Sequence, residues 1–95
     1  MMDGDFEWDE VKAASNLNRH GISFPEATTI FQDPLALTYP DPDHSLGEMR
    51  FLTFGQSTEG RVLVVAHLEI SEDHIRIISA RRATKSEIHG YQEER

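Results

Sequence analysis

The heptapeptide VLVVAHL, residues 62–68, is apolar at every position but one. A strand that is apolar on both faces belongs at the centre of a sheet, with a helix covering at least one side. Strand-like runs at 46–54 and 74–81 flank this stretch, and the central strand itself extends over 61–70. Because the segments between them, 55–60 and 71–73, are short, the three strands are predicted to form an antiparallel meander.

A short strand and a helix are predicted at the start of the chain. Residues 5–8 (DFEW) alternate between polar and aromatic side chains, which is typical of a strand. Asp9 is suited to cap the helix that follows, and Gly21 can adopt the left-handed conformation that ends one. Helical spacing predicts that the buried face between them is formed by Val11, Ala14 and Leu17.

A second helix is predicted from residue 23 to about residue 31. Ser23 is a favourable N-cap, Pro25 suits the first turn, and Glu26 stands at capping-box spacing. Residues 35–39 then predict a short edge strand, and 40–45 (PDPDHS) a loop. The apolar residues of the helix recur at helical spacing and should lie on the sheet: Phe24, Ala27, Ile30 and Phe31.

The last helix is predicted to start at Thr84, with Glu87 completing a second capping box and Ile88 and Tyr91 on one face. The predicted order of elements is therefore strand, two helices, four strands and helix. This order indicates an α+β fold, in which two N-terminal helices and one C-terminal helix pack an antiparallel four-stranded sheet that carries an extra short N-terminal strand.

Length and composition bound the class of protein. A chain of 95 residues is expected to form one domain spanning 1–95, and 38% hydrophobic with 27% charged residues is typical of a folded one. The absence of cysteine excludes disulfides, thiolate metal sites and cysteine nucleophiles. No run approaches the ~20 apolar residues of a membrane span. Because the acidic start MMDGDFEWDE is unlike a secretory signal, we expect a cytoplasmic protein without a membrane partner.

The net charge of −8 argues at first against a nucleic-acid partner. The acidity is concentrated early, however: residues 1–45 hold nine acids and two bases, whereas residues 46–95 hold eight acids and seven bases. The segment HIRIISARRATK, residues 74–85, contains no acid. It therefore forms a local basic patch, whose cationic residues are Arg76, Arg81, Arg82 and Lys85.

Motifs for metal and nucleotide cofactors are missing from the sequence. There is no HExxH, no calcium loop, no GxGxxG, no phosphate-binding GxxxxGK and no GxSxG. The five histidines are scattered rather than placed at ligand spacing. We therefore expect no metal site and no cofactor.

Arginines on adjacent predicted strands offer a site for phosphate, because guanidinium groups bind phosphate oxygens and stabilise added charge. Glu48 lies two residues from Arg50 and thus on the same strand face, where an ionised carboxylate could act as general base on a ribose 2′-hydroxyl. The alternative is a set of cross-strand salt bridges on a solvated face. The arginines concerned are Arg50, Arg61, Arg76 and Arg81, with Arg82 beside the last.

Histidines and aromatic residues each have a structural and a functional interpretation. His20, at a helix end, suits a C-cap contact or a catalytic role. His44 in its loop is either a surface residue or a proton-transfer group, and His67 belongs to the core or faces a partner. Three aromatic residues are expected to pack in the interior, and the hydroxyl of the last could also reach a phosphate: Phe6, Trp8 and Tyr91.

Several segments, taken in order, resemble the BrnT family of bacterial toxins over nearly the whole chain. The combination of WDxxK, HGxSFxxA and RIISARRA is specific. The resemblance implies a RelE-like ribonuclease fold, metal-independent cleavage of RNA, and neutralisation by a BrnA-like antitoxin that carries the DNA-binding part, so that operator DNA is reached only through the antitoxin. The matching segments are FEWDEVK (6–12), NRHGISFPEA (18–27), FQD (31–33), HSLGEMR (44–50) and RIISARRAT (76–84), followed by Glu87 and Tyr91.

The resemblance also implies site residues. The catalytic candidates are Lys12, His20, Glu48, Arg50, Arg61, Arg81 and Tyr91. The candidates for RNA binding are His44, Arg76, Arg82 and Lys85.

In this interpretation the scissile phosphate is held by Arg50, Arg61 and Arg81. Glu48 or His20 takes the 2′-proton, and His44 or Tyr91 protonates the leaving 5′-oxygen. Where the family often has Lys before the HG pair, this chain has Arg19. The alternative function is that of a catalytically inactive protein that binds an antitoxin and acts only as a co-repressor, which the net charge of −8 favours.

Overall fold

The computed structural model describes residues 2–3, 5–41 and 49–93, and it confirms the α+β class. One sheet has the strand order β1-β2-β6-β5-β4-β3. Its strands are β1 Met2–Asp3, β2 Phe6–Glu7, β3 Leu37–Pro40, β4 Arg50–Gln56, β5 Val62–Ser71 and β6 His74–Arg82. The helices are α1 Glu10–His20, α2 Phe24–Thr28 and α3 Lys85–Glu93, and the 3-10 helix η1 Thr29–Gln32 continues α2. No helix in the described part of the chain is long and apolar enough to cross a membrane.

The predicted meander is confirmed, because β3, β4, β5 and β6 pair antiparallel in succession. The N-terminal strand differs from the expected all-antiparallel sheet, since β2 pairs parallel with β6. The backbone N–H of Ile75 also donates to the carbonyl of Asp5 at 2.8 Å. The sequence contains no signal for this pairing, because a parallel contact between the two ends of the chain leaves no hairpin turn to recognise.

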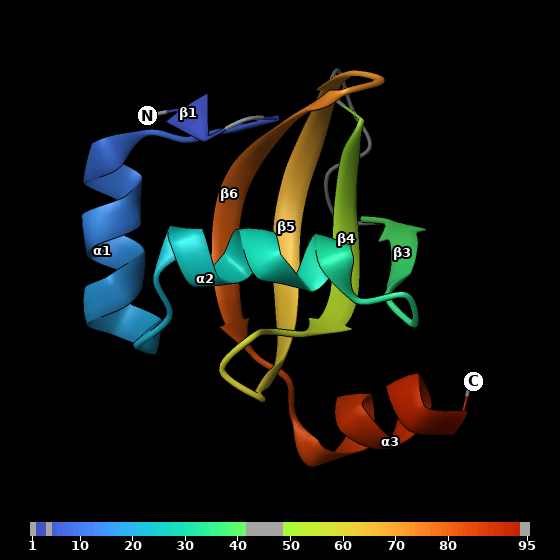
Figure 1. Cartoon of the computed structure of the whole chain (residues 1–95). Helices are drawn as coiled ribbons and strands as arrows, with labels where there is room; N and C mark the ends of the chain where they lie inside the picture. The colour runs from blue at the N-terminus through green and yellow to red at the C-terminus, as the bar shows by residue number, and fades with distance from the viewer. Residues whose placement is uncertain (1, 4, 42–48, 94–95) are drawn as a thin grey trace.

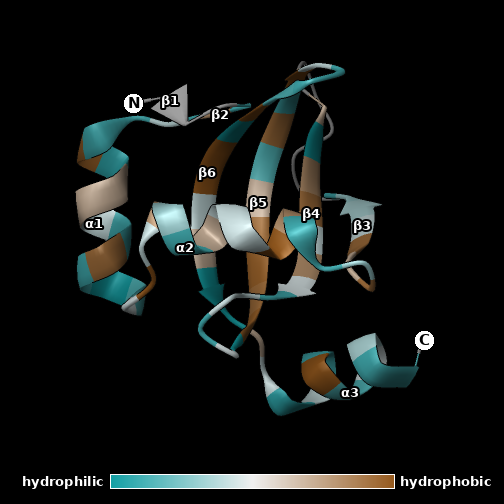
Figure 2. Cartoon of the chain, viewed as in Figure 1, coloured by the Kyte–Doolittle hydropathy of each residue, from teal (hydrophilic) through white to brown (hydrophobic). Residues whose placement is uncertain are grey.

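The second helix and its continuation cover one face of the sheet, as Figure 1 shows for α2 in front of β6, β5 and β4. Phe24, Ala27 and Ile30 are fully buried, which confirms the predicted face. Figure 2 shows the hydrophobic residues gathered along β5 and β6 behind this helix. The helix lies close to β4 at Gly55, where an added Cβ would come within 3.1 Å of Ile30. Beneath the helix, the core of the sheet consists of Leu63, Val65, Ile77 and Ala80.

The predicted caps are confirmed. The Asp9 carboxylate accepts from the backbone N–H of Val11 at 2.8 Å and of Lys12 at 3.3 Å. Gly21 ends α1 with φ of 71°, in the left-handed region that favours glycine. The Ser23 hydroxyl accepts from the N–H of Glu26 at 3.1 Å. These local signals therefore define where α1 and α2 begin and where α1 ends.

The predicted buried face of α1 is wrong. Val11 is 78% exposed and Leu17 52% exposed, whereas Asn16 is buried. Asn16 donates from Nδ2 to the carbonyls of Ile22 at 2.9 Å and Ala80 at 2.8 Å, and its Oδ1 accepts from the N–H of Ala80 at 3.0 Å. The helix lies along the edge of the sheet (Figure 1), where the Asn16 amide satisfies buried backbone groups and Ala13 packs against the core.

His67 is a core residue, which settles the choice left open by the sequence. It is 2% exposed, packs edge-on against Phe31 at 5.0 Å and stacks on Phe51 at 6.0 Å. Its Nε2 shares a 2.7 Å hydrogen bond with the hydroxyl of Thr53. Burial lowers the pKa of His67 to about 4, so the ring is neutral at physiological pH.

We expect Asn16→Ala to destabilise the fold by about 2 to 4 kcal/mol, because the change leaves buried backbone groups without partners. Urea unfolding followed by circular dichroism measures the shift in midpoint. Asn18→Ala, at an exposed position on the same helix, is the matched control and should change the midpoint little. Equal midpoints for the two variants would show that the side chain of Asn16 does not hold α1 to the sheet.

Candidate functional site

The face of the sheet opposite α2 carries cross-strand rows of side chains, because residues paired across strands point to the same side. Three of these rows concern the site. The row nearest the β5–β6 hairpin contains Arg50, Leu68, Arg76 and Glu7, and is called the arginine row here. The middle row contains Tyr39, Leu52, Ala66 and Ser79. The last row contains Leu37, Phe54, Val64 and Arg81.

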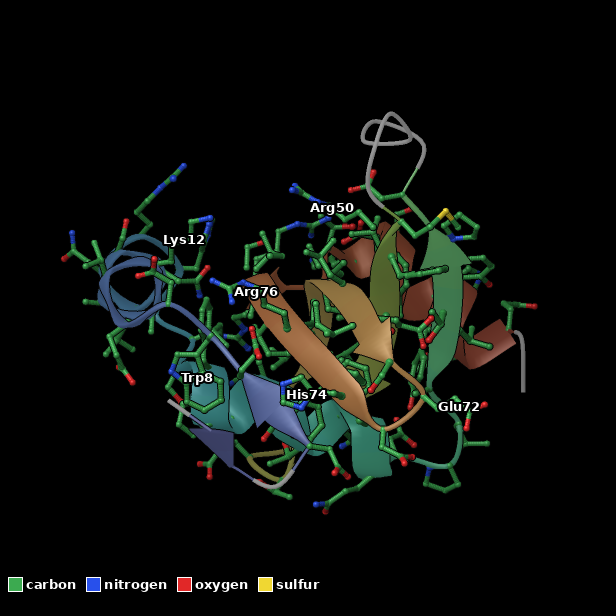
Figure 3. The ribbon with its side chains drawn as sticks, turned by 90° about the horizontal axis from the view of Figure 1, so that it is seen from above. Trp8, Lys12, Arg50, Glu72, His74 and Arg76 are labelled. Atoms are coloured by element: carbon green, nitrogen blue, oxygen red, sulfur yellow. The ribbon has the colours of Figure 1, made fainter. Side chains whose placement is uncertain are left out.

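Three cations from three elements lie on this face. Arg50 and Arg76 flank Leu68, which places their backbones two strand spacings, about 10 Å, apart. Figure 3 shows both arginines, with Lys12 of α1, on the side of the sheet away from α2. Asp9 lies near two of them: hydrogen bonds from its cap partners lower its pKa, and the charges of Lys12 and Arg76 lower it further.

A groove of about 240 Å³ continues this surface between α1 and β6. It is lined by residues one helical turn apart on α1 and by the irregular part of β6, where Ile78 has no partner on β5 and the strand bulges. The lining side chains supply two cations, an imidazole and hydroxyl groups: Lys12, Ser15, Asn16, Arg19, His20, Ile78 and Ser79. Lys12 and His20 therefore line the same groove, about two helical turns apart on α1.

Glu7 belongs to the arginine row and His74 contacts it. The sequence analysis identified neither as a site residue. The Glu7 carboxylate accepts from His74 Nε2 at 2.6 Å and forms an ion pair with Arg76. The hydrogen bond from His74, followed by that from Arg76, lowers the pKa of Glu7. The signal that could have found them is the alternation of strands 5–8 and 74–81, but only once the parallel pairing of β2 with β6 is known.

The structure does not bring Arg61 and Arg82 to this face. Arg61 donates from Nε to Glu26 at 3.0 Å and pairs with it a second time, on the side covered by α2. Arg82 pairs with buried Leu63 and is close enough to Glu26 to lower its pKa together with Arg61. The arginines therefore do not form one cluster, since the β-bulge at Ile78 puts Arg82 on the face opposite to Arg76 and Arg61 pairs with Glu26.

Arg81 lies on the face of the sheet opposite α2, called the open face here, but its side chain contacts α3. Its Nη1 and Nη2 donate to the Glu87 carboxylate at 2.8 and 2.9 Å. Glu87 and Thr84 form the predicted capping box, with N–H donations of 2.9 and 3.1 Å in the two directions. The side chain of Arg81 therefore positions the C-terminal helix.

Tyr91 is 3% exposed, and its hydroxyl donates to Asp33, which also accepts the N–H of Gln56 at 2.8 Å. The hydroxyl is therefore directed at an attachment point of α3 rather than at the arginine row. Trp8 is buried and meets Phe24 edge-on at 6.0 Å, which confirms its packing role. Phe6 packs against Phe31 at 5.3 Å.

Three further candidates complete the set. Glu48 and His44 lie outside the described residues. Lys85, the first residue of α3, is exposed. Among the residues that the structure describes, no group of three or more His, Cys, Asp and Glu side chains is placed to hold a metal ion.

Comparison with known proteins identifies the family. The model of BrnT, described as the ribonuclease toxin of type II toxin–antitoxin systems, matches residues 8–87. The chain belongs to the BrnT family. Among solved structures, the Brucella abortus ribonuclease toxin BrnT superposes with a TM-score of 0.66 and 21% identity, over 84% of this chain and 96% of that one. No curated protein matches the chain. The resemblance inferred from the motifs is thus confirmed, and the BrnT structure shares the fold.

The contact between Arg81 and Glu87 predicts a pH dependence of stability. Hydrogen bonds from Arg81, then that from Thr84, lower the pKa of Glu87 to about 2 from 4.5. Since the folded-state pKa is the lower one, the ionised carboxylate stabilises the fold above about pH 4.5, and this contribution is lost as the pH falls towards about 2. We expect Glu87→Gln to cost about 1 to 2 kcal/mol at neutral pH and little near pH 2, after allowance for solvent screening.

Urea midpoints at about pH 7, 4 and 2.5 test this expectation. Glu59→Gln, in the exposed turn before β5, is the control for the loss of one carboxylate. A difference between wild type and Glu87→Gln that stays constant over this range would contradict it.

Proposed function

We propose that this BrnT-family protein is a metal-independent endoribonuclease that cleaves RNA by attack of a ribose 2′-hydroxyl and thereby inhibits translation in the cytoplasm. The observation that supports the proposal is the placement of Lys12, Arg50 and Arg76 on one open face, from α1, β4 and β6 (Figure 3). Guanidinium and ammonium groups there can bind a phosphodiester and stabilise the charge that develops on it. Membership of a ribonuclease-toxin family supports the same substrate.

The proposed reaction needs no bound cofactor. The 2′-oxygen bonds to phosphorus and the bond to the 5′-oxygen breaks, which leaves a 2′,3′-cyclic phosphate and a 5′-hydroxyl. One group takes the 2′-proton and another gives a proton to the 5′-oxygen. The proposed base is either His20 in the groove or Glu48 on the segment before β4, and His44 is the proposed acid.

Arg50 and Arg76, with Lys12, are proposed to bind the phosphate. Arg81 supports this surface by fixing α3, whereas Arg61, Arg82 and Tyr91 are assigned roles outside the reaction because of their other contacts. Lys85 is proposed to add a cation at the rim for the RNA backbone. These cations lie on one face although the net charge of the chain is −8.

The antitoxin is proposed to be a BrnA-like protein that neutralises the toxin and carries it to operator DNA. Membership of a type II toxin family supports a protein antitoxin. The net charge of −8 favours such a basic partner over direct contact with DNA.

We expect the purified chain to cleave total RNA in excess chelator, and Arg50→Ala to reduce the rate by 100-fold or more, since such charge stabilisation typically contributes a factor of this size. Arg82→Ala removes the same charge from the other face and is the matched control. The measurement is gel analysis of the RNA, with detection of 2′,3′-cyclic phosphate ends and with DNA as an inert substrate.

Equal losses of cleavage rate in Arg50→Ala and Arg82→Ala would contradict the assignment of the reaction to the open face. Absence of cleavage by folded protein that still binds its antitoxin would instead favour the co-repressor function.

A further inference from the structure

An apolar hollow of about 310 Å³ lies on the open face between the outer strands of the sheet and α3. The sheet contributes Tyr39 and the paired residues Leu37 and Phe54 to its lining. Helix α3 contributes Ser86, Glu87, Gly90 and Tyr91. The hollow is separate from the groove between α1 and β6 and shares no residue with it.

Tyr39 gives the hollow an accessible aromatic surface. The residue is 44% exposed, and its ring meets Phe54 edge-on at 5.9 Å and 78°. This contact orients the ring. Exposed aromatic rings beside a cationic surface are the usual stacking partners of bases in single-stranded nucleic acid.

Gly90 keeps the opposite side of the hollow open. It lies in the interior of α3, where glycine is unfavourable compared with alanine. A Cβ at this position would meet no atom within 4 Å, so packing against the rest of the protein does not require glycine. Its lack of a side chain instead leaves room beside Tyr91.

Glu87 supplies a hydrogen-bond acceptor at the rim. Its Oε2 accepts one described hydrogen bond, from Arg81 at 2.9 Å, and an ionised carboxylate oxygen can accept another. Arg81 also holds the carboxylate in the ionised state. Guanine is the base whose Watson–Crick edge offers neighbouring N–H donors to such an acceptor.

The hollow and the arginine row lie on the same face. Along the strands, Tyr39 is two residues from the arginine row and Leu37 four, which corresponds to about 7 and 13 Å. Across the sheet, β3 lies one strand, about 5 Å, from Arg50 and three strands, about 14 Å, from Arg76. A base in the hollow therefore belongs to a nucleotide close to a phosphate bound by Arg50 and Arg76.

We propose that this hollow binds a guanine base of the RNA substrate, next to the phosphate bound by the arginine row. The proposal rests on the proposed function, since it names the base that the same face recognises. Stacking on Tyr39 supplies the affinity for the base, and the Glu87 carboxylate supplies the preference for guanine over the other bases.

The first experiment measures binding without cleavage. Guanosine, adenosine, cytidine and uridine 3′-monophosphates are titrated into the isotope-labelled chain, and amide shifts in β3 and α3 are followed by NMR. We expect the guanosine nucleotide to bind at least fivefold more tightly than the other three. Gly90→Leu, which fills the hollow with a good helix former, should weaken its binding at least fivefold.

Gln92→Leu adds the same side chain at an exposed position of α3 and should bind guanosine 3′-monophosphate as the wild type does. Tyr39→Leu, which removes the aromatic ring, should weaken binding as Gly90→Leu does. Equal binding of all four nucleotides would overturn the proposal. So would shifts confined to α1 and β6, or unchanged binding by Gly90→Leu.

The second experiment maps the 5′-hydroxyl ends of cleaved RNA. We expect cleavage next to guanosine in the wild type and loss of this preference in Gly90→Leu. Selective guanosine binding by a chain that cuts no RNA would support guanine binding in the hollow and contradict the proposed ribonuclease activity. RNA cleavage without selective binding would support the ribonuclease activity and contradict guanine binding in the hollow.

Discussion

The attachment of α1 to the edge of the sheet through Asn16 is the interaction on which the open face depends. Two carbonyls and one N–H from other elements are satisfied by this one amide. Helix α1 exposes Val11 and Leu17, and Ala13 is its residue packed against the core. The amide fixes the rotation of α1 that puts Lys12 beside β6, so the geometry of the site follows from a buried hydrogen-bond network.

Local sequence signals predicted most of the fold. The caps at Asp9, Ser23 and Thr84 and the left-handed Gly21 act over three or four residues, and each is present as expected. The orientation of α1 and the parallel strand β2 were not predictable in this way. Both depend on contacts with β6, which the chain reaches more than sixty residues later; helical periodicity assumes an apolar contact face, and here the contact is polar.

The candidate site was predicted less completely than the fold. Period-2 alternation separates Arg50 from Phe51, but it would put Arg76 and Arg82 on one face, and only the β-bulge at Ile78 separates them. The sequence reveals neither this bulge nor which face a helix covers. Only the structure shows that Arg61 pairs with Glu26 of α2, while Arg50 and Arg76 share the arginine row. This division sends Arg61 to a partner on the covered side, while on the open side Arg76 pairs with Glu7 and Arg81 with Glu87.

The pairing of β2 with β6 has a consequence for synthesis of the protein. Glu7 and Lys12 emerge from the ribosome early, whereas Arg76 and the strand that carries it are made near the end of the chain. The open face is therefore incomplete on a growing chain, whose central strand β5 is still without its neighbour β6. The surface proposed to bind RNA therefore forms only after β6 has left the ribosome.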